Sequence, residues 1–284
     1  MPNKQKIIKR PFELSNDKDE KIYGDIRYPD GRGQLPLVIL LHGFLAWKDW
    51  GFFPYAAERI AATGAVVINI SNSHCGVPAG ADDFIEPEKF AGYTISGEIA
   101  DTKAVIDAFV NGGIIPNSDD IWTGDIYLAG HSRGGSVALL TAAEDKRIGK
   151  VASWSGIDRF VRYPHRQIEQ FLKIGYFEFE YTRTGRMLRI NRTYLDDYEK
   201  NIERYDPKKC LPRLDIPLLF VHGKQDMTVR YRESEGLYKL AKNKNSKLHL
   251  VENAGHTLGI THPFKQTTEA LEEVLDTTIS FFDL

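Results

Sequence analysis

The sequence YLAGHSRGG, residues 127–135, places a serine in a tight turn between two expected elements of structure. The apolar residues 127–129 lead into Gly130-His131-Ser132-Arg133-Gly134, and GSVALLTAA follows as a good helix start. A serine raised on a strand-to-helix turn needs small neighbours on both sides, because larger side chains would collide with the adjacent strands. The pattern therefore indicates a nucleophilic serine. The alternative is a glycine-rich turn that happens to hold Ser132.

Further apolar runs on both sides of this segment indicate a sheet. Runs of this length and continuity are typical of strands buried on both faces. They are LPLVILLHGF (35–44), AVVINI (65–70), VASWSG (151–156), PLLFVHG (217–223) and KLHLVE (247–252), preceded by the half-alternating KIYGDIRYP (21–29). Helical stripes of apolar residues occur at Ile95, Ile99, Ile106 and Phe109, and at Leu271, Leu275, Ile279 and Phe282. The alternation predicts an α/β fold, a doubly wound, mostly parallel sheet flanked by helices, formed by residues 1–156 and 212–284.

Residues 157–211 interrupt this alternation and are too many for a plain connection between strands. The segment is rich in aromatic residues and arginine, and we expect an inserted, largely helical lid over Ser132 whose aromatic side chains form apolar walls. Of the arginines in this segment, Arg159 and Arg162 lie nearest in sequence to the expected catalytic edge of the sheet. They are candidates for holding a carboxylate or an electron-rich ring of a substrate. The alternative is that the arginines form a solvated face.

A serine hydroxyl becomes a nucleophile only with a base that is itself oriented by a carboxylate. Asp226 follows the apolar run 217–223, and His256 follows the run 247–252, so both would lie at strand ends after Ser132. The alternatives are that Asp226 caps a helix and that His256 is an ordinary loop histidine. His262 is a rival base, and Asp158, just after the run 151–156, is a rival acid.

Backbone N–H groups that could stabilise a tetrahedral intermediate are also expected at this edge. The first is the N–H of Arg133, directly after the serine, and the second is the N–H of Phe44, after the strand that ends in His42-Gly43. Trp47 and Trp50 are candidate walls of the substrate pocket, although they are equally explained as ordinary core or surface aromatics.

Composition limits the classes of partner and cofactor. With 37 basic against 39 acidic residues, the net charge is −2, which favours neither nucleic acid nor an anionic membrane surface. The charged first twenty residues have no apolar core of a signal peptide, and the sequence has no span of about 20 apolar residues. Two isolated cysteines predict neither a disulfide framework nor a zinc site. We therefore expect a soluble cytoplasmic protein that acts on a small molecule without a cofactor or metal. The sequence predicts no oligomeric state.

The motifs LLHGF, GHSRGG, HGKQD and AGH, in this order and spacing, resemble those of the α/β-hydrolase superfamily, in the style of its dienelactone-hydrolase, prolyl-oligopeptidase-like and cinnamoyl-esterase branches. The resemblance covers about residues 20–156 and 212–284. It implies that Ser132 is the nucleophile, Asp226 the acid and His256 the base. It also implies that Phe44 and Arg133 are the oxyanion donors. Dienelactone hydrolases proper have a cysteine nucleophile, whereas this chain has serine.

These observations predict a serine hydrolase that cleaves a small carboxylic ester, with an aromatic or short acyl group, through an acyl-enzyme. A serine peptidase or thioesterase would use the same three residues, since a fold of this kind does not select the substrate. The peptidase is disfavoured because no propeller or other gating domain precedes the motifs. A non-catalytic ligand-binding homologue is the alternative from another class.

Overall fold

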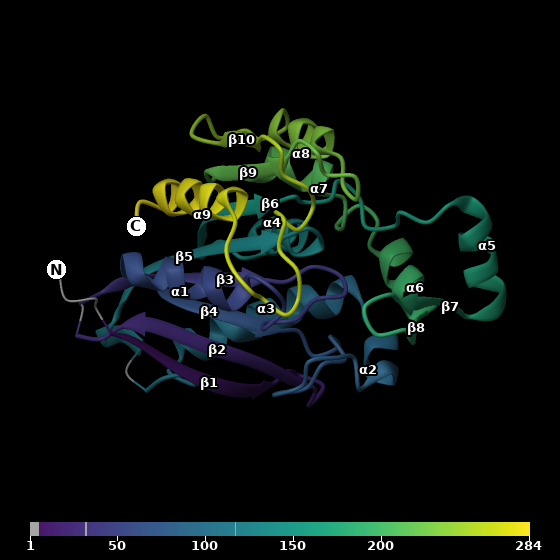
Figure 1. Ribbon diagram of the computed structural model, residues 1–284, viewed down its shortest axis with the longest axis horizontal. Helices are drawn as coiled ribbons and strands as arrows, with labels where there is room; N and C mark the ends of the chain where they lie inside the picture. Colours follow the sequence, from purple (N-terminus) through teal and green to yellow (C-terminus); the bar gives the residue numbers. More distant parts are fainter. Residues whose placement is uncertain (1–5, 32, 117) are drawn as a thin grey trace.

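The computed structural model describes residues 6–31, 33–116 and 118–284, and these residues form an eight-stranded sheet (Figure 1). Its spatial order is β1 (Ile7–Ser15), β2 (Lys21–Pro29), β4 (Val66–Ser71), β3 (Leu35–Leu41), β5 (Trp122–His131), β6 (Ile148–Trp154), β9 (Leu218–Gly223) and β10 (Lys247–Val251). The pairs β1–β2 and β2–β4 are antiparallel, and every other neighbouring pair is parallel. The predicted mostly parallel sheet is confirmed. Strand β1 lies in the charged opening segment, where no strand was predicted.

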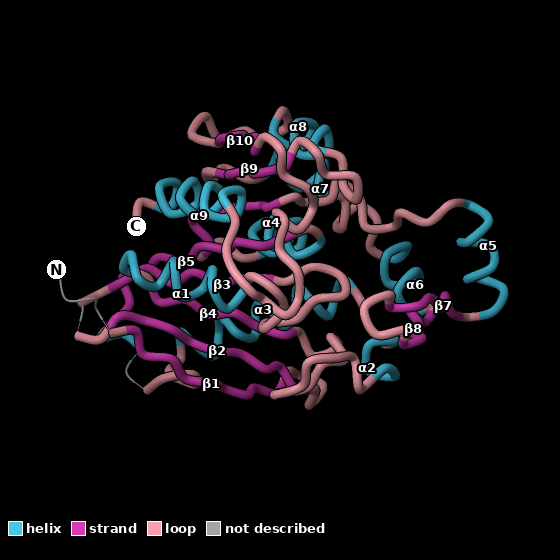
Figure 2. The backbone as a smooth tube through the Cα atoms, viewed as in Figure 1, coloured by secondary structure: helices cyan, strands magenta, loops and turns pink. Residues whose placement is uncertain are grey.

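Helices cover both faces of this sheet (Figure 2). One face carries α1 (Phe53–Gly64) and α9 (Glu269–Phe282), and the other carries α3 (Ile95–Val110), α4 (Arg133–Glu144) and α8 (Tyr231–Tyr238). Successive strand residues point to opposite faces. Val38 and Leu40 of β3 accordingly pack on the α1 side, whereas Ile39 and Leu41 pack on the α3 side. The two predicted helical stripes are therefore confirmed as the buried faces of α3 and α9.

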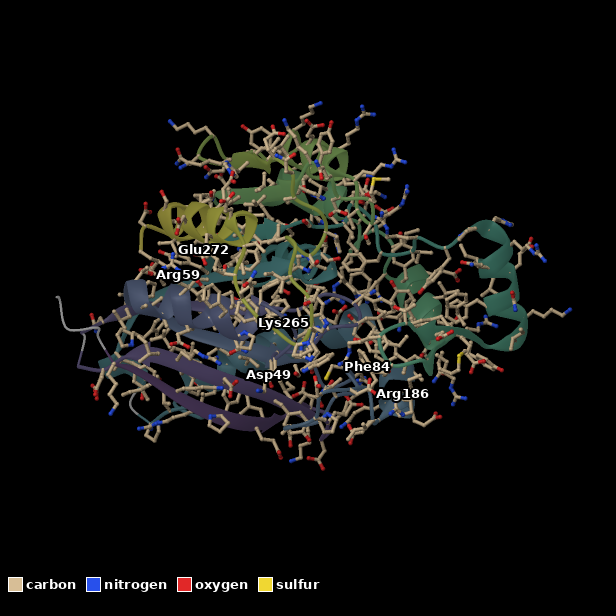
Figure 3. All side chains as sticks on the ribbon, viewed as in Figure 1. Asp49, Arg59, Phe84, Arg186, Lys265 and Glu272 are labelled. Atoms are coloured by element: carbon tan, nitrogen blue, oxygen red, sulfur yellow. The ribbon has the colours of Figure 1, made fainter. Side chains whose placement is uncertain are left out.

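Side chains between α1 and α9 join the two helices on their common face. The Arg59 Nε of α1 donates to the Glu272 Oε2 of α9 over 3.3 Å, and Figure 3 shows the two residues beside each other. The Tyr55 hydroxyl also donates to the Glu272 carboxylate. The C-terminal helix is thereby fixed on the sheet next to the strands that precede the predicted acid and base.

The insertion, residues 157–211, departs from the expectation of a largely helical segment. It contains α5 (His165–Ile174), α6 (Thr193–Lys200) and α7 (Pro207–Cys210), but also the antiparallel strands β7 (Tyr176–Tyr181) and β8 (Arg186–Asn191). The sequences YFEFEY and RMLRIN alternate with a period of two, which is typical of strands. Gly185, with φ of +70°, closes the turn between them, because glycine adopts positive φ without strain.

The insertion is attached to the rest of the molecule beyond one end of the sheet (Figure 1). Strand β8 packs against the short helix α2 (Pro87–Ala91), and the Arg186 Nε donates to the Asp83 Oδ2 over 3.2 Å. Figure 3 shows Arg186 near Phe84, which follows Asp83 in the sequence. At the other side, Asp197 of α6 accepts the backbone N–H of Ser96 at the start of α3. These contacts hold the insertion at the end of the sheet where β6 finishes.

Candidate active site

Ser132 lies in the sharp turn between β5 and α4, with φ of +56° and ψ of −121°. The turn requires glycine on both sides. A Cβ atom on Gly130 would lie 2.3 Å from the Gly134 carbonyl oxygen, and one on Gly134 would lie 2.4 Å from the Leu41 and His42 carbonyl oxygens. Positive φ is uncommon for a residue other than glycine and is found preferentially where a site demands it. The backbone therefore holds Ser132 in a constrained position at the carboxyl end of β5.

Ser132, His256 and Asp226 form a continuous chain of hydrogen bonds. The His256 Nε2 lies 3.0 Å from the Ser132 Oγ, and the His256 Nδ1 lies 2.7 Å from the Asp226 Oδ2. Asp226 follows β9 and His256 follows β10, so the parallel sheet brings the three residues to one edge. The carboxylate accepts the Nδ1 proton, which leaves the Nε2 lone pair free to accept the serine proton. This arrangement can convert the Ser132 hydroxyl into a nucleophile.

The Asp226 carboxylate is buried and accepts four hydrogen bonds. Its Oδ1 accepts the backbone N–H groups of Thr228 and Val229, each over 2.8 Å, and its Oδ2 accepts from His222 and His256. Burial alone would raise the pKa of Asp226, but the hydrogen bonds from the two histidines and from Val229 outweigh it and lower the pKa well below its usual range. The carboxylate is consequently ionised at neutral pH.

A second buried histidine holds the loop that carries His256. The His131 Nε2 donates to the His256 carbonyl oxygen over 2.8 Å, and the two rings pack with centroids 4.8 Å apart. Burial lowers the pKa of His131 to about 3, so the ring is neutral at physiological pH. In the sequence, His131 resembles an ordinary residue at the end of an apolar strand, and no pattern there indicates the contact with residue 256.

The backbone N–H of Arg133 directly follows Ser132 in the turn, and the segment that carries the N–H of Phe44 lies against this turn. A Cβ atom on Gly43 would lie 3.1 Å from both the His131 carbonyl oxygen and the Ser132 Cβ, which brings the Phe44 segment against the turn. The His42 Nδ1 donates to the Gly43 carbonyl oxygen over 2.8 Å and fixes this segment. In the described part of the chain neither N–H group has a hydrogen-bond acceptor. Both are therefore available to an oxyanion.

A cavity of about 230 Å³ lies beside Ser132. Its lining combines the serine turn with aromatic and aliphatic residues of the insertion and of the loop after β9. The lining residues are Phe44, Ser132, Arg133, Ile157, Phe160, Arg162, Tyr163, Tyr194, Thr228 and Val229. Its volume is below the range of about 300–1,000 Å³ that is typical of drug-sized ligands, which points to a small group.

The Arg133 side chain joins the insertion to the core at the wall of this cavity. Its Nε donates to the Glu98 Oε2 over 2.7 Å, and its Nη1 donates to the Tyr194 hydroxyl over 2.9 Å. The Tyr194 hydroxyl in turn donates to the Phe160 carbonyl oxygen, and the guanidinium carbon lies 4.4 Å from the centre of the Tyr93 ring. Glu98 pairs with this buried charge, whereas the buried Arg133 Nη2 has no hydrogen-bond partner among the described residues.

Of the predicted pocket residues Trp47, Trp50, Arg159 and Arg162, only Arg162 is among the described residues that line the cavity. Its Nη1 and Nη2 donate to the Glu233 carboxylate over 2.6 and 2.8 Å, so its charge is already paired. The Arg159 side chain is 63% exposed and is not among the described residues that line the cavity. Trp47 is only 1% exposed and packs against Phe84 and His262 in the core. Sequence position alone could not reveal these partners.

The rival acid and base lie outside the hydrogen-bond chain. The Asp158 Oδ2 pairs with the Lys208 Nζ at 2.6 Å. The His262 Nδ1 accepts the Gly51 N–H, and its Nε2 contacts the Asp82 carboxylate. Among the described side chains, His256 is thus the imidazole that hydrogen-bonds to Ser132, and Asp226 is the carboxylate that hydrogen-bonds to the His256 Nδ1.

Replacing Glu233 with glutamine should destabilise the protein at neutral pH by about 1–3 kcal/mol. Burial opposes ionisation of Glu233, but hydrogen bonds from Arg162 and from the Asp158 N–H outweigh it and lower the pKa from 4.5 to about 2. A carboxylate whose pKa is depressed on folding stabilises the native state above its unfolded pKa. That stabilisation is lost as the pH falls from about 4.5 toward 2. Urea unfolding at pH 7, 5 and 3.5 should therefore show the difference between wild type and variant shrinking below about pH 4.5.

Glu235→Gln, on the same helix, is the control and should change the free energy of unfolding by less than about 0.5 kcal/mol at each pH. A Glu233→Gln deficit that stays constant from pH 7 to 3.5 would show that the ion pair with Arg162 is not its source.

No helix in the described ranges combines the length and the apolar character that a bilayer crossing requires. Within the same ranges, no cluster of three or more His, Cys, Asp and Glu side chains is arranged to hold a metal ion.

Comparison with known proteins places this geometry in context. The sequence model that represents the alpha/beta hydrolase family matches residues 38–270 of this chain. The structure of Est1E from Butyrivibrio proteoclasticus with bound ferulic acid superimposes with a TM-score of 0.72 at 22% identity, covering 95% of this chain and 97% of that chain. No sequence among the curated proteins matches the chain.

Two further solved structures have the same fold. Dienelactone hydrolase from Anabaena variabilis superimposes with a TM-score of 0.63 at 17% identity, covering 98% of this chain and 97% of that one. Alpha/beta hydrolase domain-containing protein 10 from mouse gives a TM-score of 0.68 at 16% identity, with 96% and 98% covered. At these identities the likenesses establish the fold alone.

Proposed function

The chain belongs to the α/β-hydrolase family, and from that premise we propose that it is a serine esterase whose nucleophile is Ser132. The observation that carries the proposal is the hydrogen-bond chain from the Ser132 Oγ through His256 to the buried Asp226 carboxylate. Nucleophile, base and orienting acid are the parts that acyl transfer requires. Ser132 also lines the cavity of about 230 Å³, whose volume supports a small acyl group.

In the proposed reaction, the Ser132 Oγ attacks the ester carbonyl carbon while the His256 Nε2 takes the hydroxyl proton. The carbonyl oxygen becomes an oxyanion, which the N–H groups of Phe44 and Arg133 stabilise. Collapse of this intermediate breaks the bond to the alcohol oxygen, which receives the proton from His256. The acyl group stays on Ser132. Water then attacks the acyl-enzyme by the same steps, releasing the carboxylic acid and restoring the serine.

We further propose that the insertion acts as a lid that selects the acyl group. Ile157, Phe160, Arg162, Tyr163 and Tyr194 of the cavity wall all belong to it. Arg162 at the wall is paired with Glu233, and Arg159 is not among the described lining residues, which supports a neutral acyl group over the expected binding of a substrate carboxylate by either arginine. The volume and aromatic walls support a short or single-ring acyl group. Est1E, of the same fold, was solved with an aromatic acid, which makes aromatic esters the first to test.

A fluorophosphonate probe tests the proposed nucleophile directly. The wild-type protein should become labelled at Ser132, and prior acylation by an ester substrate should slow the labelling. A protein that turns over esters without labelling at Ser132 would contradict the proposal. Thioesters and aminoacyl anilides, assayed beside the esters, distinguish the esterase from a thioesterase or peptidase on the same residues.

Phe160→Ala should shift the acyl-chain preference toward longer chains. Phe160 is 4% exposed, and its truncation enlarges the cavity next to Ser132. The ratio of kcat/KM for 4-nitrophenyl octanoate to that for the butanoate should rise by about tenfold, which corresponds to burial of about two of the four additional methylenes at about 0.8 kcal/mol each. The control is Met187→Ala, on the insertion but 52% exposed, which should leave the ratio unchanged. An unchanged ratio in Phe160→Ala would place selectivity elsewhere.

A further inference from the structure

His222 is a fully buried histidine on β9, four residues before Asp226. Its Nε2 lies 3.1 Å from the Asp226 Oδ2 and 2.8 Å from the Val229 carbonyl oxygen, and its Nδ1 lies 2.7 Å from the Ser234 Oγ. Both ring nitrogens are thus engaged in hydrogen bonds. The sequence shows only a histidine at the end of an apolar strand.

The partners of His222 fix which nitrogen carries the proton. A carboxylate oxygen and a carbonyl oxygen both face Nε2, and neither can donate, so Nε2 must carry the hydrogen. Nδ1 then has a lone pair, and the Ser234 hydroxyl can donate to it. The neutral ring therefore satisfies all of these hydrogen bonds, and its Nε2–H donates to the Asp226 Oδ2.

We propose that His222 is a positioning residue for ester hydrolysis, holding the Asp226 carboxylate ionised and oriented so that its Oδ2 accepts the Nδ1 proton of His256. The inference rests on the proposed function, because it assigns a task within that mechanism. Oδ2 receives two imidazole donors, at 2.7 Å from His256 and 3.1 Å from His222, while Oδ1 is held by the Thr228 and Val229 N–H groups. The four donors leave the carboxylate a single orientation.

Loss of the His222 donor has a defined electrostatic consequence. The Asp226 carboxylate would keep its charge with one hydrogen bond fewer, and it would attract a proton on His256 more strongly. Because the reaction needs a neutral His256, the ascending limb of kcat/KM against pH should move to higher pH.

Other charged or titratable groups face Asp226 and His256 from the surrounding elements. His131 contacts the His256 ring from the serine turn, and Arg162 of the insertion acts on Asp226 electrostatically while paired with Glu233 of α8. The variants below leave all of these in place, so a displaced limb reports the change at His222.

The test compares His222→Leu, which removes the donor, with His222→Gln, whose amide nitrogen can replace Nε2–H. In His222→Leu we expect kcat to fall by about tenfold or more, KM to stay within about twofold, and the acid limb to rise by about 0.5–1 pH unit. His222→Gln should restore most of kcat and return the limb toward the wild-type position. Leu237→Ala, a buried truncation on α8, should lower Tm without moving the limb.

A folded His222→Leu protein with wild-type kcat and pH profile would overturn the proposal, whatever its Tm. Where that variant does not fold, nitrogen-15 NMR of histidine-labelled wild-type protein decides. His222 should carry its proton on Nε2, whereas a proton on Nδ1 instead would overturn the inference. The NMR result does not depend on turnover, so failure of the esterase proposal is seen separately, as absence of Ser132 labelling.

Discussion

Replacing Ser132 with alanine is expected to abolish ester hydrolysis, lowering kcat by about 10⁴- to 10⁶-fold. The Oγ 3.0 Å from the His256 Nε2 is the atom that would form the acyl-enzyme, and alanine has no atom in its place. Removing the nucleophile from a serine, histidine and aspartate that act together lowers kcat about as much as removing all three residues, because the remaining base has no hydroxyl to activate. Hydrolysis of 4-nitrophenyl acetate and butanoate, measured with the circular dichroism spectrum and Tm, tests this.

The fold of this variant should be unaffected. Glycines at positions 130 and 134, rather than the serine hydroxyl, allow the turn to form, and the backbone N–H of residue 132 keeps its 2.7 Å hydrogen bond to the Trp154 carbonyl oxygen. Ser136→Ala, four residues on in α4, is the matched control and should stay within a few-fold of wild-type activity. A folded Ser132→Ala protein with a large share of wild-type turnover would show that the nucleophile is another residue.

Local steric rules explain why the sheet and the serine turn could be predicted from the sequence. Strands buried on both faces need continuous apolar runs, and the turn after β5 needs glycine where a Cβ would strike the β3 carbonyl groups. Both requirements are visible within ten residues. The proximity of Ser132, Asp226 and His256 can be predicted as well, since each follows a strand and parallel strands bring their carboxyl ends to one edge of the sheet.

Features that depend on long-range partners could not be predicted in the same way. Arg162 is paired with Glu233, 71 residues later, and this contact decides whether its charge is available to a substrate. His131 contacts the His256 carbonyl oxygen, 125 residues away. Each of these side chains also has an ordinary structural explanation in sequence, and only the folded arrangement selects between them.

The β7–β8 hairpin is a different case, because its signal was present locally. The alternation in YFEFEY and RMLRIN indicated strands, and Gly185 indicated the turn between them. The aromatic and arginine content of the same segment is equally typical of a lid that forms pocket walls. The sequence did not predict strand β1, because its charged side chains are as typical of a loop as of an edge strand.

Asp226→Asn should lower kcat by about 10⁴-fold, whereas Asp158→Asn should leave it within about tenfold of wild type. Asparagine at 226 removes the negative charge that stabilises a protonated His256. Its amide can also donate toward Nδ1 and select the tautomer that cannot accept the serine proton. Asp158 instead pairs with Lys208 and lies 4.0 Å from the Arg162 Nη1, so its neutralisation should mainly weaken contacts within the insertion.

The two variants are informative as a pair because both acids follow strands of the same sheet edge and both face cationic or imidazole groups. Kinetics on 4-nitrophenyl butanoate and thermal unfolding should separate them. Asp226→Asn should be defective in kcat far beyond any loss of stability, since the Thr228 and Val229 N–H groups can still hold the amide oxygen in place. Asp158→Asn should show the reverse balance. If Asp158→Asn were instead the slower enzyme, the acid would have to reach His256 from the strand next to the serine, which requires the insertion to release Asp158 from Lys208 during the reaction.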